Sequence, residues 1–313
     1  MSAHSLLLIG ILCSSFVTGL IIFFLREESH SLRTWLNLLG ATVKLVLVAI
    51  LIGEVYLYPG QLGAIHWAML PGMDFALGAD GISILFVALS AVLWFLTTIY
   101  AIGYLEDSPH RSRFFGFFSL CVSATTGIAL SANLVTLFIF YELLTVSTYP
   151  LVVHRGTAKA MKGGKVYLTY TMIGGAVLLL AVVWLQSLAG PVEFAERGSL
   201  SLIANDYSPE LRVIFFLFIA AFGVKAALVP LHGWLPKAMI APAPVSALLH
   251  AVAVVKAGAF GIIRIVYDVF GVQTASNLGL LHPLVIAACF TIVYGSVRAL
   301  TQDELKKRLA YST

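Results

Sequence analysis

Several uninterrupted apolar runs of about 20 residues constrain this chain more than any other feature. A helix of that length crosses the hydrocarbon core of a bilayer. Composition agrees, since 60% of the residues are hydrophobic, only 11% are charged and the mean hydropathy is +0.96. We therefore predict an all-α polytopic membrane protein. Its nine predicted spans cover residues 5–25, 34–57, 80–102, 114–132, 134–153, 165–188, 211–230, 243–269 and 280–299.

The basic residues alternate between the two sides of these spans. Arg197 and Arg212 fall on one side, and most of the 19 lysines and arginines fall on the other. Loops rich in Lys and Arg stay in the cytoplasm, so we expect the N-terminus outside. We expect the first span to be a retained helix, because no basic residue precedes it and it is too long for the apolar region of a signal peptide. The basic side comprises Arg26, Arg33, Arg111, Arg113, Arg155, Lys159, Lys162, Lys165, Lys237, Arg298, Lys306, Lys307 and Arg308.

Two ionisable residues lie deep inside predicted spans. Glu142 shares a helical face with Thr145 and Tyr149, and Lys225 lies in the run FFLFIAAFGVKAALVPL. Charged residues at the membrane centre cost about 2.5–3.5 kcal/mol on insertion scales and usually serve a function. Burial disfavours the charged form of such a group and an opposite charge favours it. A Glu142–Lys225 pair would therefore bind protons with an affinity that depends on its separation. The alternative is a static ion pair that joins two helices.

Prolines follow Lys225 closely along the chain. Pro230 comes five residues later, and proline removes a helical hydrogen bond and crowds the preceding turn. Irregular backbone at membrane depth is tolerated where it lines a water-filled cavity or is buried in protein. We predict a helix break at Pro230. Pro242 and Pro244 also fit a surface turn between two spans.

The next span carries two further candidates for proton transfer, His250 and Lys256. In a regular helix, six residues correspond to about 9 Å of rise and about 240° of rotation, so the two side chains would form successive steps on different faces. A hydrogen-bonded structural role is the alternative for His250. Gly258 and Gly261 would let a neighbouring helix approach closely.

Other polar features are weaker. Lys44 and Glu54 lie in the second span, where snorkelling to the surface explains Glu54. Arg264 and Asp268, four residues apart, could pair with each other. The three cysteines lie far apart in apolar runs, which indicates neither a disulfide framework nor metal-ligand spacing. We expect no catalytic residues, metal, cofactor or nucleic-acid partner.

Four motifs together resemble those of a known family. They are ADGIS at Ala79–Ser83, FYELLTVSTYPLV around Glu142, FGVKAALVPLHGWLPKAMIAPAPVSALLHAVAVVKAGAFGIIR from Phe222, and DELKKRLAYST at the end. The chain resembles, from its third span on, the proton-translocating membrane subunits shared by respiratory complex I and Mrp-type multisubunit Na⁺/H⁺ antiporters. Among these subunits, we expect the chain to resemble the D subunit of the antiporter.

The resemblance implies a fold of fourteen helices with two inverted five-helix repeats, each containing a broken helix. Residues 1–110 would be an N-terminal three-helix segment with an outer loop at 58–79. Residues 111–270 would be the first, proton-translocating repeat, and residues 271–313 would begin an incomplete second repeat. We accordingly expect a truncated or split polypeptide, or a second chain that completes the fold.

The resemblance also implies roles for single residues. In the family, a glutamate on the second helix of the repeat pairs with a lysine on the broken helix, which corresponds to Glu142 and Lys225. A lysine or histidine on the next helix carries protons towards the centre, which corresponds to Lys256 with His250 nearby.

Three functions remain open on these grounds. The first is a proton-translocating subunit of a multisubunit antiporter exchanging Na⁺ or K⁺ for H⁺ in the bacterial cytoplasmic (inner) membrane, with other membrane subunits as partners. The second is a coupling subunit of a complex I-like NADH:quinone oxidoreductase, a membrane hydrogenase or an inorganic-carbon uptake complex. The third is a scaffold without transport. Retention of Glu142, Lys225 and Lys256 disfavours the scaffold, because their insertion is costly.

Overall fold

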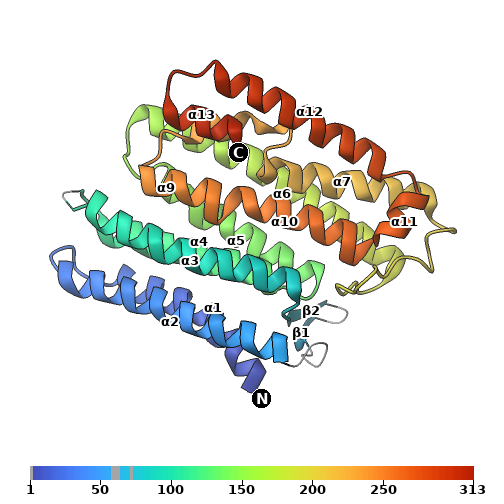
Figure 1. Cartoon of the computed structure of the whole chain (residues 1–313), viewed down its shortest axis with the longest axis horizontal. Coiled ribbons are helices and arrows are strands. Elements are labelled where there is room, and N and C mark those ends of the chain that lie inside the picture. The colour runs from blue at the N-terminus through green and yellow to red at the C-terminus, as the bar shows by residue number, and fades with distance from the viewer. Residues whose placement is uncertain (1–2, 58–63, 71–72, 107) are drawn as a thin grey trace.

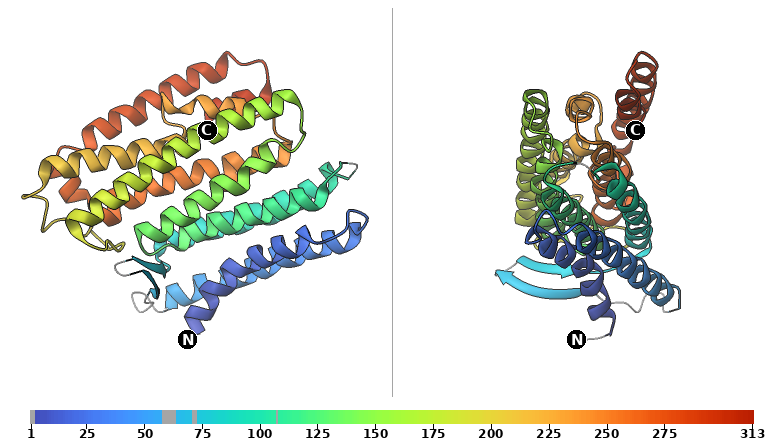
Figure 2. Two further views of the ribbon diagram at one scale, coloured as in Figure 1. Left: turned by 180° about the vertical axis from the view of Figure 1, so that it is seen from behind. Right: turned by 90° about the vertical axis from the view of Figure 1, so that its left-hand side faces the viewer.

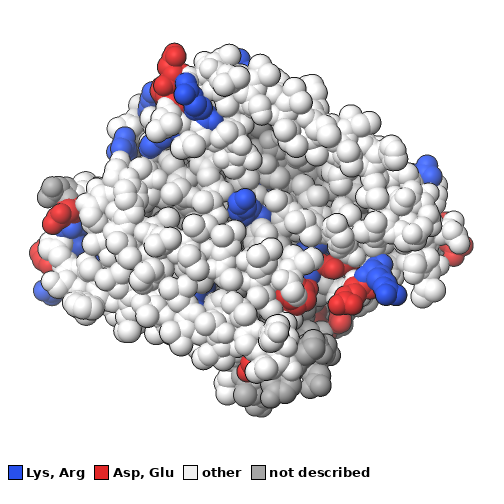
Figure 3. Space-filling model, in the orientation of Figure 1, with Lys and Arg blue, Asp and Glu red and all other residues white. Residues whose placement is uncertain are grey.

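A computed structural model describes residues 3–57, 64–70, 73–106 and 108–313 (Figure 1). Within these residues, nine helices are long and apolar enough to cross a membrane, which confirms the predicted all-α architecture. The long helices lie side by side with their axes roughly aligned, and two further views show the same layered arrangement (Figure 2). Figure 3 shows charged side chains gathered at the two ends of this bundle and a largely uncharged band between them.

Three of the helices in the N-terminal half begin at side-chain caps. The side chains of Asp80, Asn133 and Thr157 accept hydrogen bonds from backbone N–H groups in the first turns of α3, α5 and α6, as N-cap residues do. α6 starts about two turns before the predicted residue 165. The helices of this half are α1 (Ala3–Phe23), α2 (His30–Leu57), α3 (Gly81–Tyr104), α4 (Arg111–Leu130), α5 (Leu134–Val152) and α6 (Ala158–Ala189).

A β hairpin occupies part of the predicted outer loop, whose residues 58–63 and 71–72 lie outside the described residues. Strands β1 (Ile65–Leu70) and β2 (Met73–Leu77) pair antiparallel, with Ile65 opposite Leu77. The rings of Trp67 and Phe75 lie 5.8 Å apart between centroids, a typical cross-strand aromatic contact. The backbone N–H of Ala76 donates to Thr136 Oγ1 at 2.8 Å. The hairpin therefore rests on the start of α5.

The C-terminal half is more irregular than the sequence predicts. α7 (Ser208–Ala226) is followed by a 3-10 turn η1 (Leu231–Trp234) and α8 (Leu235–Ala238). The eighth predicted span divides into α9 (Ala243–Ala247), a π-helical turn η2 (Leu248–Val252), α10 (Val254–Arg264) and a second π-helical turn η3 (Ile265–Val269). The chain ends with α11 (Val272–Asn277), α12 (Leu281–Leu300) and α13 (Leu305–Ser312).

The bundle is built around α4, which is almost wholly buried. It packs against α1, α3 and α5, while α7 packs against both α6 and α10. α12 lies at the edge and exposes most of its apolar side chains. The first six helices and α7–α10 thereby enclose the polar residues that the sequence places at membrane depth.

Arg264 connects the C-terminal end of α10 to the N-terminal end of α3. Its buried guanidinium forms ion pairs with Asp80 and, at 2.6 Å, with Asp268, and it also donates to Ser83 Oγ at 2.6 Å. The Arg264–Asp268 pair was predicted, whereas the role of Asp80, far away in sequence, was not. Burial alone would raise the pKa of Asp80, but Arg264 holds that pKa below its ordinary value.

We expect Arg264→Gln to lower the free energy of unfolding by about 3–5 kcal/mol, because it leaves the buried carboxylate of Asp268 without its partner. Lys307→Gln is the control: it breaks the exposed Glu304 pair and should change stability by at most about 1 kcal/mol. Equilibrium unfolding in mixed micelles measures both. In the parent protein, the contribution of Asp80 to the free energy of unfolding should be lost as the pH falls through the lowered pKa of Asp80. Arg264→Gln should abolish that dependence of stability on pH. Equal effects of the two variants would contradict the assignment.

Candidate functional site

Lys225 is the most enclosed cation of the predicted site. It lies in the last turn of α7 and is fully buried. Its Nζ donates a hydrogen bond to the backbone carbonyl oxygen of Tyr141 on α5 and lies 3.3 Å from the centroid of the Tyr141 ring. The Tyr141 hydroxyl in turn donates to the carbonyl oxygen of Ala221 at 3.0 Å. Tyr141 therefore joins α5 to α7 and supplies both acceptors that the ammonium group contacts.

Glu142 is the next residue on α5 and is only partly buried. Its Oε1 is inaccessible to solvent and has no hydrogen-bond partner. The carboxylate packs against Gly175 of α6, where an added Cβ would collide with Oε1. Glu142 and Lys225 are close enough for a Coulombic interaction but do not form a direct ion pair among the described residues. The site thus holds two neighbouring opposite charges that remain separate.

More polar groups gather around this pair than the sequence alone identifies. The Cys121 thiol lies 3.3 Å from Ser147 Oγ and 3.4 Å from Thr148 Oγ1, so it is part of a polar cluster and not merely a small apolar residue. The Tyr167 hydroxyl is buried beside Thr148 without a well-aligned hydrogen bond, and its ring centroid lies 5.3 Å from that of Trp234. Such buried polar groups are uncommon in folded proteins. The hydroxyl-bearing residues at helical spacing in FYELLTVSTYPLV were the feature of the sequence that could have indicated this polar cluster.

The predicted helix break lies directly after Lys225. Ala227 has a left-handed backbone with φ of 60°, and Pro230 precedes the 3-10 turn η1. The carbonyls freed at the end of α7 find new donors: Leu228 N–H bonds to Gly223 O at 2.9 Å, and Trp234 Nε1 to Val224 O at 2.6 Å. These hydrogen bonds explain how an interrupted helix is tolerated within a membrane span.

The break also contacts α12. The backbone N–H of Val229 donates to Thr291 Oγ1 at 3.1 Å. Thr291 itself donates to the carbonyl oxygen of Ala287, one turn earlier on α12. The edge helix is thus attached to the bundle at the point where α7 ends.

Lys256 lies on α10, which packs against α7, but it is only partly buried and makes no ion pair or hydrogen bond among the described residues. Two residues later, a Cβ added at Gly258 would lie 2.7 Å from Phe222 O and 2.8 Å from the Lys225 carbonyl carbon. The predicted close approach is therefore present, and it brings α10 against the backbone of Lys225.

His250 lies six residues before Lys256, in the π-helical turn η2. Its Nε2 lies 3.0 Å from Met239 Sδ, while its Nδ1 is buried without a partner. The regular helix assumed between His250 and Lys256 is wrong, because η2 and the non-helical backbone of Ala253 intervene. Pro242 is the N-cap of α9 and Pro244 lies in its first turn, and both are buried, so they start a helix and do not form the surface turn considered for them.

Lys44 is a second fully buried cation, to which the sequence alone assigns no role. It lies on α2 and donates hydrogen bonds to Ser15 Oγ at 3.0 Å and to Thr126 Oγ1. Its Nζ lies 5.2 Å from the Trp94 ring centroid. Glu54 pairs with His4 at 3.0 Å near the ends of α1 and α2. No cluster of His, Cys, Asp and Glu suited to a metal ion occurs among the residues that the structure describes.

Two family models match the chain. One, described as "NADH:quinone oxidoreductase/Mrp antiporter, TM", matches residues 131–313, and one described as "NADH-Ubiquinone oxidoreductase (complex I), chain 5 N-terminus" matches residues 67–115. Two solved structures share the fold. The membrane-bound sulfane sulfur reductase, an archaeal respiratory membrane complex, aligns with 98% of this chain and 61% of its own at 25% identity and a TM-score of 0.80. The Mrp complex from Dietzia sp. aligns with 99% of this chain and 32% of its own at 24% identity and a TM-score of 0.81.

Curated relatives give the same result. The A/B subunit of a probable K(+)/H(+) antiporter of Rhizobium meliloti is 31% identical over 95% of this chain and 29% of its own length. The A1 subunit of a Na(+)/H(+) antiporter of Staphylococcus haemolyticus is 35% identical over 80% of this chain and 30% of its own. NAD(P)H-quinone oxidoreductase chain 5 of Synechocystis sp. is 33% identical over 80% of this chain and 37% of its own length.

The chain thus spans about a third of the length of these relatives. They are named as A1 and A/B antiporter subunits and as chain 5, so the particular similarity to the antiporter's D subunit stays a prediction. The family itself was predicted correctly from the sequence motifs. The chain is an integral membrane protein that belongs to the NADH:quinone oxidoreductase/Mrp antiporter transmembrane family.

Proposed function

We propose that this chain is a proton-translocating part of a multisubunit monovalent cation/proton antiporter. The observation that carries the proposal is the arrangement of Glu142 and Lys225, a partly buried carboxylate and a fully buried ammonium group that lie near each other without pairing directly. The names of the antiporter relatives support it. The exchanged cation would be Na⁺ or K⁺, and other membrane subunits would complete the complex.

The separation of the two charges is what gives them a transport role. A directly paired carboxylate and ammonium would stabilise each other's charge and resist a change of protonation. Here Lys225 is held by the carbonyl and ring of Tyr141, and Oε1 of Glu142 has no partner. A small displacement of either side chain would therefore change the proton affinity of both. Glu142 and Lys225 would be the first two proton stations.

The onward route would run from α7 to α10. The break near Pro230 opens the end of α7 beside Lys225, and α10 crosses there at Gly258. Lys256 would receive the proton next, and His250 would serve as a further station near Met239. We further propose that residues 111–270 form the translocating repeat, and that the N-terminus lies outside the bacterial cytoplasmic (inner) membrane, as the basic loops favour.

A second candidate is a coupling subunit of a complex I-like oxidoreductase. The match of residues 67–115 to the chain 5 N-terminus and the quinone oxidoreductase relative favour it. The same proton stations would then respond to a redox partner in place of a cation gradient. The two candidates differ in what drives proton movement and not in the residues that carry it.

The first test is Glu142→Gln in the complete complex, reconstituted in everted vesicles. Because Gln is isosteric but cannot exchange a proton, we expect proton movement to fall by roughly a hundredfold or more, the scale set by loss of a positioned proton-transfer group. A pH-sensitive fluorescent dye follows collapse of an imposed pH gradient after addition of Na⁺ or K⁺. A response to quinone reduction in place of cations would favour the second candidate.

Glu54→Gln is the matched control, because Glu54 lies near the end of another span and pairs with His4. It should transport at the parent rate, with assembly of both variants checked by size-exclusion chromatography. Normal transport by Glu142→Gln would make Glu142 a structural charge and would overturn the proposal.

A second variant moves the carboxylate without removing it. An added methyl group at Gly175 would collide with Oε1 of Glu142, at the end of a flexible side chain, so Gly175→Ala should shift the carboxylate and leave the fold intact. We expect the initial rate of proton movement to fall by about tenfold to a hundredfold, as misplacement of a reacting group does. Gly53→Ala, which meets nothing within 4 Å, should be neutral. Identical rates for the two alanine variants would exclude a dependence on the position of Glu142.

A further inference from the structure

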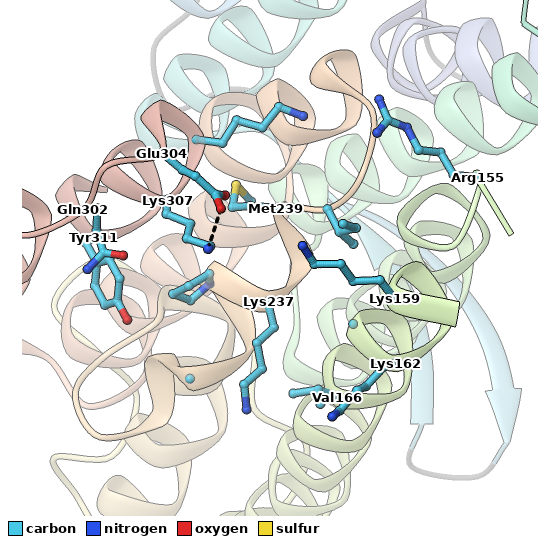
Figure 4. Close-up of a pocket in the computed structure, with 15 residues that line it drawn as sticks. Arg155, Lys159, Lys162, Val166, Lys237, Met239, Gln302, Glu304, Lys307 and Tyr311 are labelled. Atoms are coloured by element: carbon cyan, nitrogen blue, oxygen red, sulfur yellow. Dashed lines mark hydrogen bonds and ion pairs between the residues drawn. The ribbon is translucent and has the colours of Figure 1, made fainter. Parts of the chain in front are cut away.

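A cavity of about 540 Å³ lies at the end of the bundle where the basic residues concentrate (Figure 4). It is enclosed by the start of α6, by α8 and by the segment that runs into α13. In Figure 4, the lysines of α6 lie across the cavity from Glu304 and Lys307. Its basic lining residues are Arg155, Lys159, Lys162, Lys237, Lys306 and Lys307.

The positive charge of this cavity is not balanced. Among the described residues that line it, Glu304 is the only carboxylate, and it is engaged by Lys307 at 2.8 Å. The other five cations have no acidic partner there. Lys306 donates to the carbonyl oxygen of Ala241 at 2.8 Å, and burial together with nearby Arg155 lowers the pKa of Lys306. The cavity therefore favours an anion that contacts several cations at once.

The remaining walls are apolar. Val166, Pro236, Met239 and Ile240 line the cavity between the lysines, and Gly163 and Gly233 leave room by lacking side chains. The cavity lies beside the first turns of α6 and beyond the end of α12, which is the level where membrane spans end. A ligand that fits both kinds of wall carries a negative charge next to hydrocarbon.

We propose that this cavity binds the phosphodiester headgroup of an anionic phospholipid from the leaflet on the basic side of the membrane. Basic pockets between transmembrane helices recognise such headgroups, and the apolar walls accept the glycerol and the first part of the acyl chains. A free phosphate ion shares the charge but would leave those walls without contact. The site is separate from Glu142 and Lys225 and does not depend on the proposed transport.

The test is equilibrium binding to the intact protein purified in a neutral detergent. Isothermal titration calorimetry compares dioctanoyl phosphatidylglycerol with dioctanoyl phosphatidylcholine and with inorganic phosphate. We expect phosphatidylglycerol to bind at one site, and Lys162→Gln/Lys237→Gln to weaken binding by at least roughly tenfold. The control, Arg26→Gln/Lys165→Gln, removes two exposed charges from the same side of the membrane but outside the cavity. It should change affinity by less than about twofold.

A second pair, Arg155→Gln/Lys159→Gln, removes two other cations of the cavity and keeps the proposal testable if the first double variant fails to fold. Three results would overturn the proposal. They are equal affinity for the two lipids, equal effects of the cavity variants and the control, and displacement of phosphatidylglycerol by inorganic phosphate at similar concentration. Crosslinking of the cavity lysines to an acidic partner polypeptide that excludes lipid would also overturn it.

Discussion

The buried ammonium group of Lys225 is the constraint around which this fold is organised. A cation at membrane depth requires acceptors in place of water, and Tyr141 supplies them through its backbone carbonyl and its ring. The same tyrosine fixes α5 to α7 through its hydroxyl. The position of Glu142 follows, because the next residue on α5 is rotated by about 100° and turns towards Gly175 of α6. One tyrosine thereby determines both the placement of the cation and its separation from the carboxylate.

The broken backbone after Lys225 is the second consequence of this arrangement. An interrupted helix leaves carbonyl and N–H groups that must find partners in a nonpolar environment. Leu228, Trp234 and Thr291 provide them, two from the break itself and one from α12. A chain segment that is irregular but hydrogen-bonded at these positions can hold its shape next to the buried Lys225. The attachment of α12, an otherwise exposed helix, depends on the same groups.

The sequence predicts the helices well because each depends on local information. Apolar runs give the spans, although the start of α6 was missed because the N-cap Thr157 was not used. The other parts that were missed depend on contacts distant in sequence. Arg264 pairs with Asp80 across the bundle, and Lys44 reaches Thr126 on another helix. The π-helical turns and the β hairpin have no local signal of comparable strength. The motif ADGIS shows the difference, since Asp80 caps α3 within its own turn, whereas its partner Arg264 lies 184 residues away along the chain.

The way each buried cation is held separates two kinds of charge in this protein. Arg264 contacts two carboxylates and a hydroxyl, and a guanidinium does not lose its proton in proteins. That group acts as a fixed joint between α3 and α10. Lys225 and Lys44 contact only neutral oxygens and aromatic rings, and an amine can release its proton without leaving a carboxylate unpaired. A static ion pair, the alternative considered for Glu142 and Lys225, therefore describes Arg264 with Asp80 and Asp268 better.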